Sequence, residues 1–166
     1  GWLAGKVDMS EEPDGRVSAS AVFHKLGLLP FLSVVIMDIS LAALAVVITG
    51  LLTSSTTIML FSGLFAVAGH NWSIFLKFKG GLGATSILGA VSVILTWYVF
   101  YGLILAGIVF FITHRTGLST IIGILGFSGV ILIQDGVGLL ALFPLMLLAL
   151  MFLKRYQVSR ITDTAS

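Results

Sequence analysis

The stretch from Leu26 to Leu153 makes up most of the chain, yet it contains only five formally charged residues. Apolar blocks of this length exceed what a core helix of a soluble domain needs, and ~18 nearly uncharged residues are enough to cross a bilayer. The pattern excludes a soluble globular domain and predicts an all-α integral membrane protein. The five charges are Asp38, Lys77, Lys79, Arg115 and Asp135.

Polar interruptions divide the apolar stretch into about six transmembrane or partly inserted helices. The block 84–113 is interpreted as two short helices that meet at an aromatic turn near Trp97, Tyr98 and Tyr101, with one long tilted helix as the alternative. We expect 1–166 to form a single membrane domain, with a polar segment 1–25, a helical bundle 26–153 and a tail 154–166. The other apolar blocks are 26–52, 58–68, 118–133 and 137–153.

The positions of the basic residues predict which loops share a membrane face. Six crossings place 1–25, 69–83, 114–116 and 154–166 on one side, together with all nine lysines and arginines and all three histidines. Under the positive-inside rule that side is cytoplasmic, and so is the C-terminus. Topology therefore accounts for the net charge of +2, and nucleic acid is not an expected partner. The polar N-terminal residues predict no signal peptide.

A glycine-rich loop between two apolar segments is the main candidate for a binding site. Gly80, Gly81 and Gly83 precede a helix expected to start near Ala84, and Lys77 and Lys79 add charge. Glycines allow backbone N–H groups to converge, and the positive end of the following helix reinforces them, so the pattern is typical of an anion site. The alternative is a tight turn whose lysines mark the cytoplasmic side.

Two polar residues near this loop have competing interpretations. Asp38 lies inside an apolar span, where a carboxylate is costly unless it is paired, and we expect a structural hydrogen bond to a neighbouring helix. His70 either contacts a substrate or bonds to a loop carbonyl. A transporter is a weaker hypothesis, because Asp38 is the one plausible ionisable group at the midplane and no repeat with paired broken helices is evident.

A second group of small residues lies between 119 and 129. Ser119 and Thr120 are either helix caps or phosphate donors. Gly123, Gly126 and Gly129 recur every three residues, which favours close helix packing. The chain has no cysteine, no His-Glu-x-x-His motif and no phosphate-loop lysine motif, so neither a metal nor a nucleotide cofactor is expected.

The segment GHNWSIFLKFKGGLGATSILG resembles the middle signature of the bacterial acyl-phosphate:glycerol-3-phosphate acyltransferases. Four further stretches align with the family in order: DGRVSASAVFHKLG, DISLAALAV, TGLSTI and KRYQVSRI. The initial GWLAGK resembles the end of the family's first helix, so we expect the rest of that helix to be missing. The signature positions that match are Gly69, His70, Phe75, Phe78, Lys79, Gly80, Gly81, Gly83 and Gly89.

This resemblance implies transfer of a fatty acyl chain from acyl phosphate to the 1-hydroxyl of glycerol 3-phosphate, in phospholipid synthesis at the bacterial plasma membrane. It implies that the glycine loop cradles the phosphates and that His70 is the catalytic positioning group, with Lys79 and Arg160 as charge partners. An acyl phosphate is already activated, so no metal or cofactor is implied.

Several polar positions of the family signature are replaced here. Leu82 and Leu41 stand where the family has lysine, and each lost charge-assisted contact costs roughly 1.5–3 kcal/mol. The alternative is therefore a catalytically degenerate relative, acting as a lipid-binding or structural subunit beside other membrane subunits. The remaining replaced positions are Asp14, Arg16, His24, Lys154 and Gln157.

Overall fold

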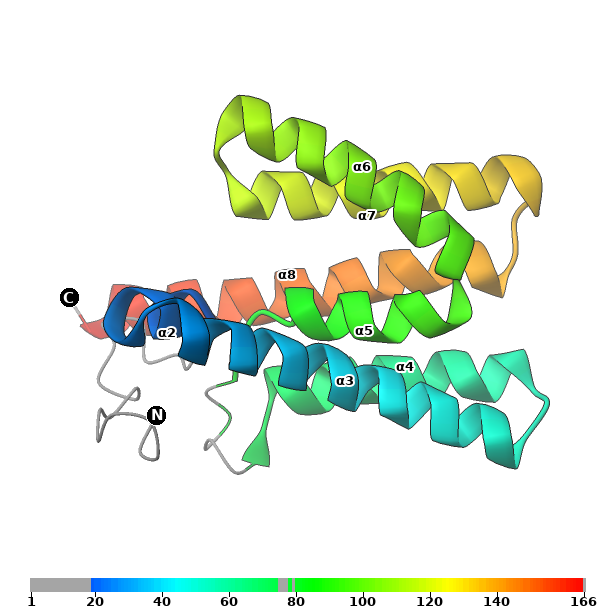
Figure 1. Cartoon of the computed structure of the whole chain (residues 1–166), viewed down its shortest axis with the longest axis horizontal. Helices are drawn as coiled ribbons and strands as arrows, with labels where there is room; N and C mark the ends of the chain where they lie inside the picture. Colours follow the sequence, from blue (N-terminus) through cyan, green and yellow to red (C-terminus); the bar gives the residue numbers. More distant parts are fainter. Residues whose placement is uncertain (1–18, 75–77, 79, 166) are drawn as a thin grey trace.

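A computed structural model of the chain describes residues 19–74, 78 and 80–165, and within these ranges it forms seven α-helices and no strand (Figure 1). The predicted all-α class is confirmed. Four helices of the described chain are long and apolar enough to cross a membrane: α3, α6, α7 and the Leu139–Arg160 part of α8. The helices are α2 (Ala19–Leu26), α3 (Leu28–Leu52), α4 (Thr56–Asn71), α5 (Ala84–Ile94), α6 (Thr96–Thr113), α7 (Thr116–Gln134) and α8 (Leu139–Ala165).

The apolar block 84–113 is broken into two helices, as the first interpretation expected. Leu95 leaves the helical conformation, with φ −122° and ψ 39°, and separates α5 from α6. The aromatic residues follow this break directly, and the Tyr98 hydroxyl donates a 2.6 Å hydrogen bond to Asp135 Oδ2 at the end of α7. The break therefore lets α6 turn away from α5 and pair with α7.

The segment after Leu153 continues α8 as a helix rather than beginning a separate tail. Lys154 and Val158, one turn apart, are both buried on the same side of α8. Helical spacing brings residues four apart onto one face, so packing on that face extends the helix beyond its apolar part.

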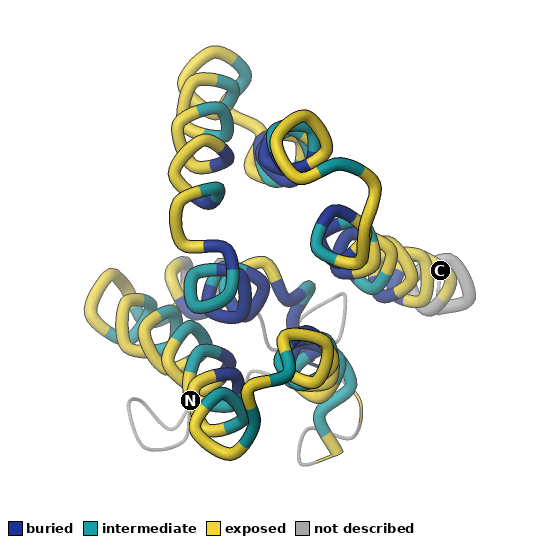
Figure 2. Tube along the Cα trace, turned by 90° about the vertical axis from the view of Figure 1, so that its right-hand side faces the viewer, coloured by how far each residue is buried: buried dark blue, intermediate teal, exposed yellow. Residues whose placement is uncertain are grey.

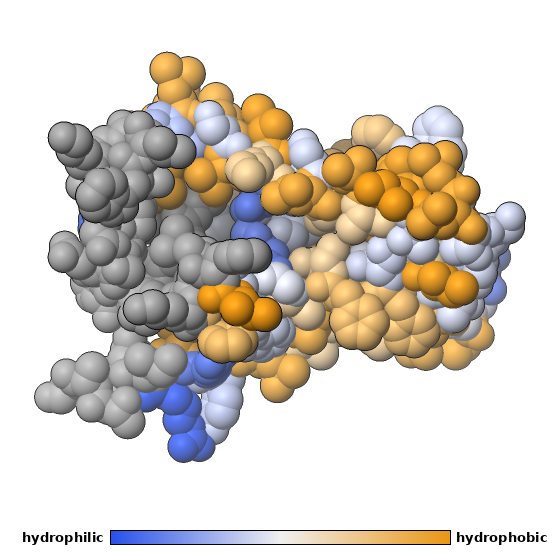
Figure 3. All heavy atoms as spheres, turned by 90° about the horizontal axis from the view of Figure 1, so that it is seen from below, coloured by the Kyte–Doolittle hydropathy of each residue, from blue (hydrophilic) through white to orange (hydrophobic). Residues whose placement is uncertain are grey.

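The helices pack around one connected apolar core. α3 lies against α4 and α5, α6 pairs with α7, and α8 contacts both α4 and α7. Figure 2 shows buried positions on the inward sides of the helices and exposed positions on their outward sides. Many outward residues are large and apolar, such as Leu29 on α3 and Phe111 on α6, which are 78% and 82% exposed. Apolar side chains also cover much of the face in Figure 3. Such a surface suits contact with lipid.

Glycines allow two helix crossings to be unusually close. A Cβ on Gly89 would overlap the backbone of Ile39 in α3. A Cβ on Gly123 would lie 2.9 Å from the Gly102 carbonyl oxygen in α6, and one on Gly126 would overlap the Leu105 side chain. Close packing is thus confirmed for Gly123 and Gly126, whereas the expectation is wrong for Gly129, where an added Cβ would have no neighbour within 4 Å.

The connections fall into two groups at opposite ends of the bundle (Figure 1). The α4–α5 loop, the α6–α7 turn and the end of α8 lie at one end. The described basic residues belong to this end: Lys25, Arg115, Lys154, Arg155 and Arg160. Four other basic residues, Lys6, Arg16, Lys77 and Lys79, lie outside the described residues.

Replacing Gly89 with alanine tests the closest crossing. A backbone carbonyl cannot move aside as a side chain can, so Gly89→Ala should lower the free energy of unfolding by ~1–3 kcal/mol. Gly107→Ala is the matched control on α6, because nothing lies within 4 Å of its added Cβ, and it should be neutral or slightly stabilising. Unfolding in detergent measures both variants. Equal stability of the two would contradict the packing described here.

Candidate functional site

A carboxylate inside the first long helix connects three helices. Thr85 Oγ1 of α5 donates a 2.8 Å hydrogen bond to Asp38 Oδ2, and His70 Nδ1 of α4 lies 3.3 Å from Asp38 Oδ1. The Asp38 and His70 side chains are only 15% and 26% exposed. The expected bond from Asp38 to a neighbouring helix is confirmed. Among the described residues, the partner of His70 Nδ1 is that carboxylate.

The glycine loop folds directly onto the last residues of α4. A Cβ on Gly80 would lie 2.7 Å from the Asn71 carbonyl oxygen, and one on Gly81 would lie 3.0 Å from His70 Nε2. A Cβ on Gly83 would overlap the Asn71 side chain, and Gly83 also has a φ of +79°. Gly80 and Gly83 are therefore required sterically by α4, Gly81 packs tightly on the His70 ring, and the structure brings all three glycines together with His70.

The loop ends at the N-terminus of α5, as the sequence predicts. Gly83 is the N-cap, and the first helical hydrogen bond runs 2.7 Å from Ile87 N to Gly83 O. The amides of residues 84–86 therefore have no acceptor within the helix, and the helix dipole adds partial positive charge at this end. Leu82 packs against the apolar core, so its side chain adds no charge here.

Asn71, the last residue of α4, is the polar residue that sequence reasoning missed. It is 0% exposed, and neither Nδ2 nor Oδ1 has a hydrogen-bond partner in the described part of the chain. Buried carboxamides without partners are rare in native proteins. A signal was present, since Asn71 directly follows His70 at the end of an apolar helix.

Lys154 of α8 holds the other side of the loop. It is 2% exposed, its Nζ donates a 2.7 Å hydrogen bond to the Phe78 carbonyl, and it lies 5.7 Å from the Trp72 ring centroid. Trp72 Nε1 in turn donates a 2.7 Å hydrogen bond to Gln157 Oε1. Phe78 adopts a φ of +64°, a conformation that costs energy for a bulky residue. These contacts fasten the loop to α8.

The remaining predicted site residues have other surroundings. Arg160 stacks on Tyr156 at 5.1 Å, and its Nε donates a 2.8 Å hydrogen bond to the Tyr156 hydroxyl one turn earlier on α8. Lys79 lies outside the described residues. Ser119 and Thr120 each donate to a carbonyl four residues earlier, and the N-cap of α7 is Arg115, so the cap alternative is wrong.

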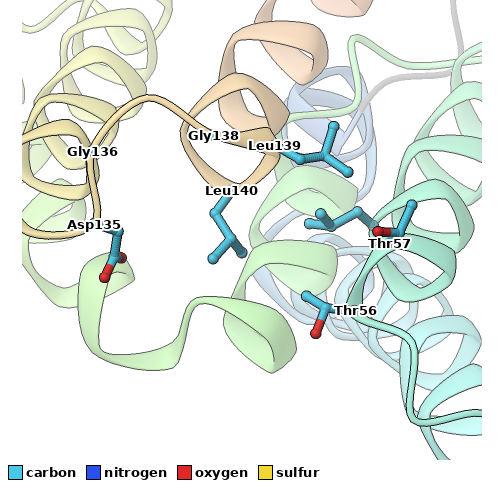
Figure 4. A pocket seen from close by; sticks show the side chains of 8 residues that line it. Thr56, Thr57, Asp135, Gly136, Gly138, Leu139 and Leu140 are labelled. Carbon is cyan, nitrogen blue, oxygen red and sulfur yellow. The ribbon is translucent and has the colours of Figure 1, made fainter.

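Two of the cavities lined by described residues lie outside the loop itself. One of about 170 Å³, between α5, α6 and α7, begins at Ala84 beside the glycine loop and is lined mainly by apolar residues such as Val91 and Phe127. The other, of about 290 Å³, lies at the opposite end of the bundle, where Thr56 and Thr57 of α4 face Leu140 and Asp135 (Figure 4). The described residues contain no group of three or more side chains suited to holding a metal ion.

Comparison with known proteins identifies the family. A family model described as glycerol-3-phosphate acyltransferase matches residues 1–164. The chain belongs to this family. A glycerol-3-phosphate acyltransferase of Trichodesmium erythraeum is 32% identical over 148 residues, which cover 77% of this chain and 64% of that protein. One from Ehrlichia canis is 31% identical over 121 residues, covering 73% and 63%. The resemblance seen in the sequence is confirmed.

Other family members match over shorter stretches. Glycerol-3-phosphate acyltransferase 5 of Dehalococcoides mccartyi is 37% identical over 92 residues, covering 55% of this chain and 39% of that protein. The chain therefore spans less than two thirds of the length of the curated relatives it matches first.

A solved structure has the same fold. It is the crystal structure of PlsY (YgiH), an integral membrane glycerol 3-phosphate acyltransferase, in the glycerol 3-phosphate form. The TM-score is 0.77 at 23% identity, and the match covers 98% of this chain and 82% of that one. Together with the apolar helices, this establishes a multi-pass integral membrane protein.

Lys154→Met tests how the loop is held. Removing the ammonium breaks a charge-assisted hydrogen bond worth ~1.5–3 kcal/mol, so backbone amides between α4 and α5 should exchange with deuterium faster. Arg155→Met is the matched control, since Arg155 Nη1 faces Gly117 of α7 instead. Hydrogen–deuterium exchange with mass spectrometry compares the two. Unchanged exchange in the Lys154 variant would show that the loop is held by other contacts.

Proposed function

We propose that this protein is a membrane glycerol-3-phosphate acyltransferase, which transfers an acyl group from acyl phosphate to glycerol 3-phosphate. The observation that carries the proposal is the junction of the glycine loop with α5, where the N-cap Gly83 lies against the buried carboxamide of Asn71. Family membership, and the glycerol 3-phosphate named for the related crystal structure, support the choice of substrate.

In this proposal the phosphates bind at the N-terminus of α5. Gly80, Gly81 and Gly83 let the loop pass close to the end of α4, and the amides with the helix dipole stabilise the anion. Lys79 and Arg160 supply formal positive charge from the loop and from α8. His70, held by Asp38 through Nδ1, presents Nε2 towards Gly81 and positions the substrate.

The acyl tail would occupy the apolar cavity that begins at Ala84, which places the carboxyl-phosphate end beside the loop. The glycerol 1-hydroxyl oxygen then attacks the acyl carbonyl carbon, a new ester C–O bond forms and the C–O bond to phosphate breaks. The hydroxyl proton is taken up by the released phosphate, and the product is lysophosphatidate. Orientation and electrostatic stabilisation supply the catalysis.

The proposal also assigns a membrane and an orientation. The described basic residues gather at the end of the bundle that holds the glycine loop. Under the positive-inside rule this end faces the cytoplasm of a bacterial plasma membrane, with the C-terminus on the same side. The chain 1–166 then acts as one membrane domain.

A second candidate function is a catalytically degenerate relative that binds lipid or supports a membrane complex. Two observations favour it. Leu82, at the position where the family signature has lysine, packs against the core, and Lys154 is engaged by the Phe78 carbonyl.

Turnover measured on the purified protein separates the two functions. Given acyl phosphate and labelled glycerol 3-phosphate in detergent, the protein should release lysophosphatidate. The His70→Ala substitution should lower the rate of this release. Leu82→Lys should raise the rate roughly 10- to 150-fold, because it restores a charge-assisted contact worth ~1.5–3 kcal/mol.

Leu52→Lys is the matched control, since Leu52 is exposed at the opposite end of the bundle, and it should leave the rate unchanged. Absence of lysophosphatidate with the wild-type protein and with Leu82→Lys would overturn the acyltransferase proposal and favour the degenerate relative.

A further inference from the structure

Asn71 differs from three other buried polar residues of the described chain. Ser119 and Ser128 donate to carbonyls of their own helices, and Lys154 donates to the Phe78 carbonyl. Asn71 is 0% exposed, yet both polar atoms of its carboxamide lack a partner among the described residues. Leaving a donor and an acceptor buried without partners opposes folding, so such a group is typical of a binding site whose ligand provides the partners.

The carboxamide lies at the candidate anion site and not elsewhere in the core. Its Oδ1 occupies the space that a Gly83 Cβ would need, and Gly83 is the N-cap of α5. Gly80 covers the Asn71 backbone carbonyl on the other side. A helix N-terminus and an unpaired buried carboxamide are independent features, and they meet at one point.

The glycine loop that covers Asn71 has no bulky side chains at the three glycine positions that face the end of α4. Gly80, Gly81 and Gly83 all face the end of α4, so a small displacement of their backbone exposes the carboxamide to a ligand at the α5 amides. Asn71 itself is fixed at the end of α4, next to His70, whose Nδ1 is held by Asp38.

We infer that Asn71 is a substrate-contacting residue that recognises the hydroxyl-bearing part of a phosphorylated polyol. A carboxamide offers one acceptor and two donor hydrogens, so Oδ1 accepts from a ligand hydroxyl while Nδ2 donates to a ligand oxygen. The amides at the start of α5 bind the phosphate, and Asn71 hydrogen-bonds to the hydroxyl groups of the carbon chain beside it. This inference rests on the proposed function, because it assigns substrate selectivity to the same site.

The consequence is discrimination between phosphates that differ only in their hydroxyl groups. The hydroxyl groups of glycerol 3-phosphate can form hydrogen bonds with the Asn71 carboxamide. The analogue n-propyl phosphate has the same chain length but no hydroxyl group. A site built to bond a hydroxyl rejects an analogue that lacks it, since its own polar atoms are then left unpaired. The wild-type protein should therefore bind glycerol 3-phosphate at least about tenfold more tightly than propyl phosphate.

Calorimetric titration of the full chain in nanodiscs, with each of the two phosphates, tests this. Asn71→Leu should bring the ratio of the two dissociation constants close to one, mainly by weakening glycerol 3-phosphate. The same variant without ligand should be as stable as the wild type or more so, because an unpaired carboxamide is replaced by an apolar group of similar size. Gln134→Leu, an amide removed at the far end of α7, is the control and should keep the wild-type ratio.

Each outcome has a distinct meaning. An unchanged ratio in Asn71→Leu, or equal binding of both phosphates by the wild type, overturns the role of Asn71 and leaves the phosphate site standing. Absence of binding of either phosphate by the wild type overturns the proposed function as well. If Asn71→Leu does not fold, Asn71→Ala introduces no atom that could clash, and its ratio is interpreted in the same way.

Discussion

The partly buried carboxylate of Asp38 makes the contacts on which the arrangement of the polar end depends. A carboxylate within a membrane span needs partners, and here they come from two other helices, His70 of α4 and Thr85 of α5. These contacts bring the end of α4 beside the start of α5. The loop between the two helices must then pass over His70 and Asn71 at a distance that requires glycine at Gly80 and Gly83.

Close packing against α4 and phosphate binding would each explain the glycines in this loop. Gly80 and Gly83 are required, and Gly81 is tightly packed, because α4 lies directly beneath them, so a glycine run is no evidence for phosphate by itself. The stronger indication comes from what the loop encloses. First-turn amides of α5 and the carboxamide of Asn71 are polar groups that the described protein does not pair, and in the proposed function a phosphorylated substrate pairs them. Lys154, on the opposite side, keeps the loop in position through Phe78.

Local patterns predicted much of this fold. Helix positions, the break near Trp97 and the start of α5 follow from apolar blocks and polar or aromatic interruptions, and the bond of Asp38 follows from the cost of a charge in a span. The missed features depend on distant residues. The partner of Lys154 is 76 residues away in sequence, so neither its burial nor the continuation of α8 could be seen locally. Arg160 matched a family position, but its contact with Tyr156 depends on side-chain conformation.

The central claim is that the junction of the glycine loop and α5 binds the phosphate of glycerol 3-phosphate. A structure of the protein determined with glycerol 3-phosphate tests this most directly. We expect the phosphate within hydrogen-bond distance of the amides at the start of α5 and the glycerol beside Asn71. A phosphate bound instead in the cavity near Asp135 at the opposite end, with the glycine loop empty, would contradict the account.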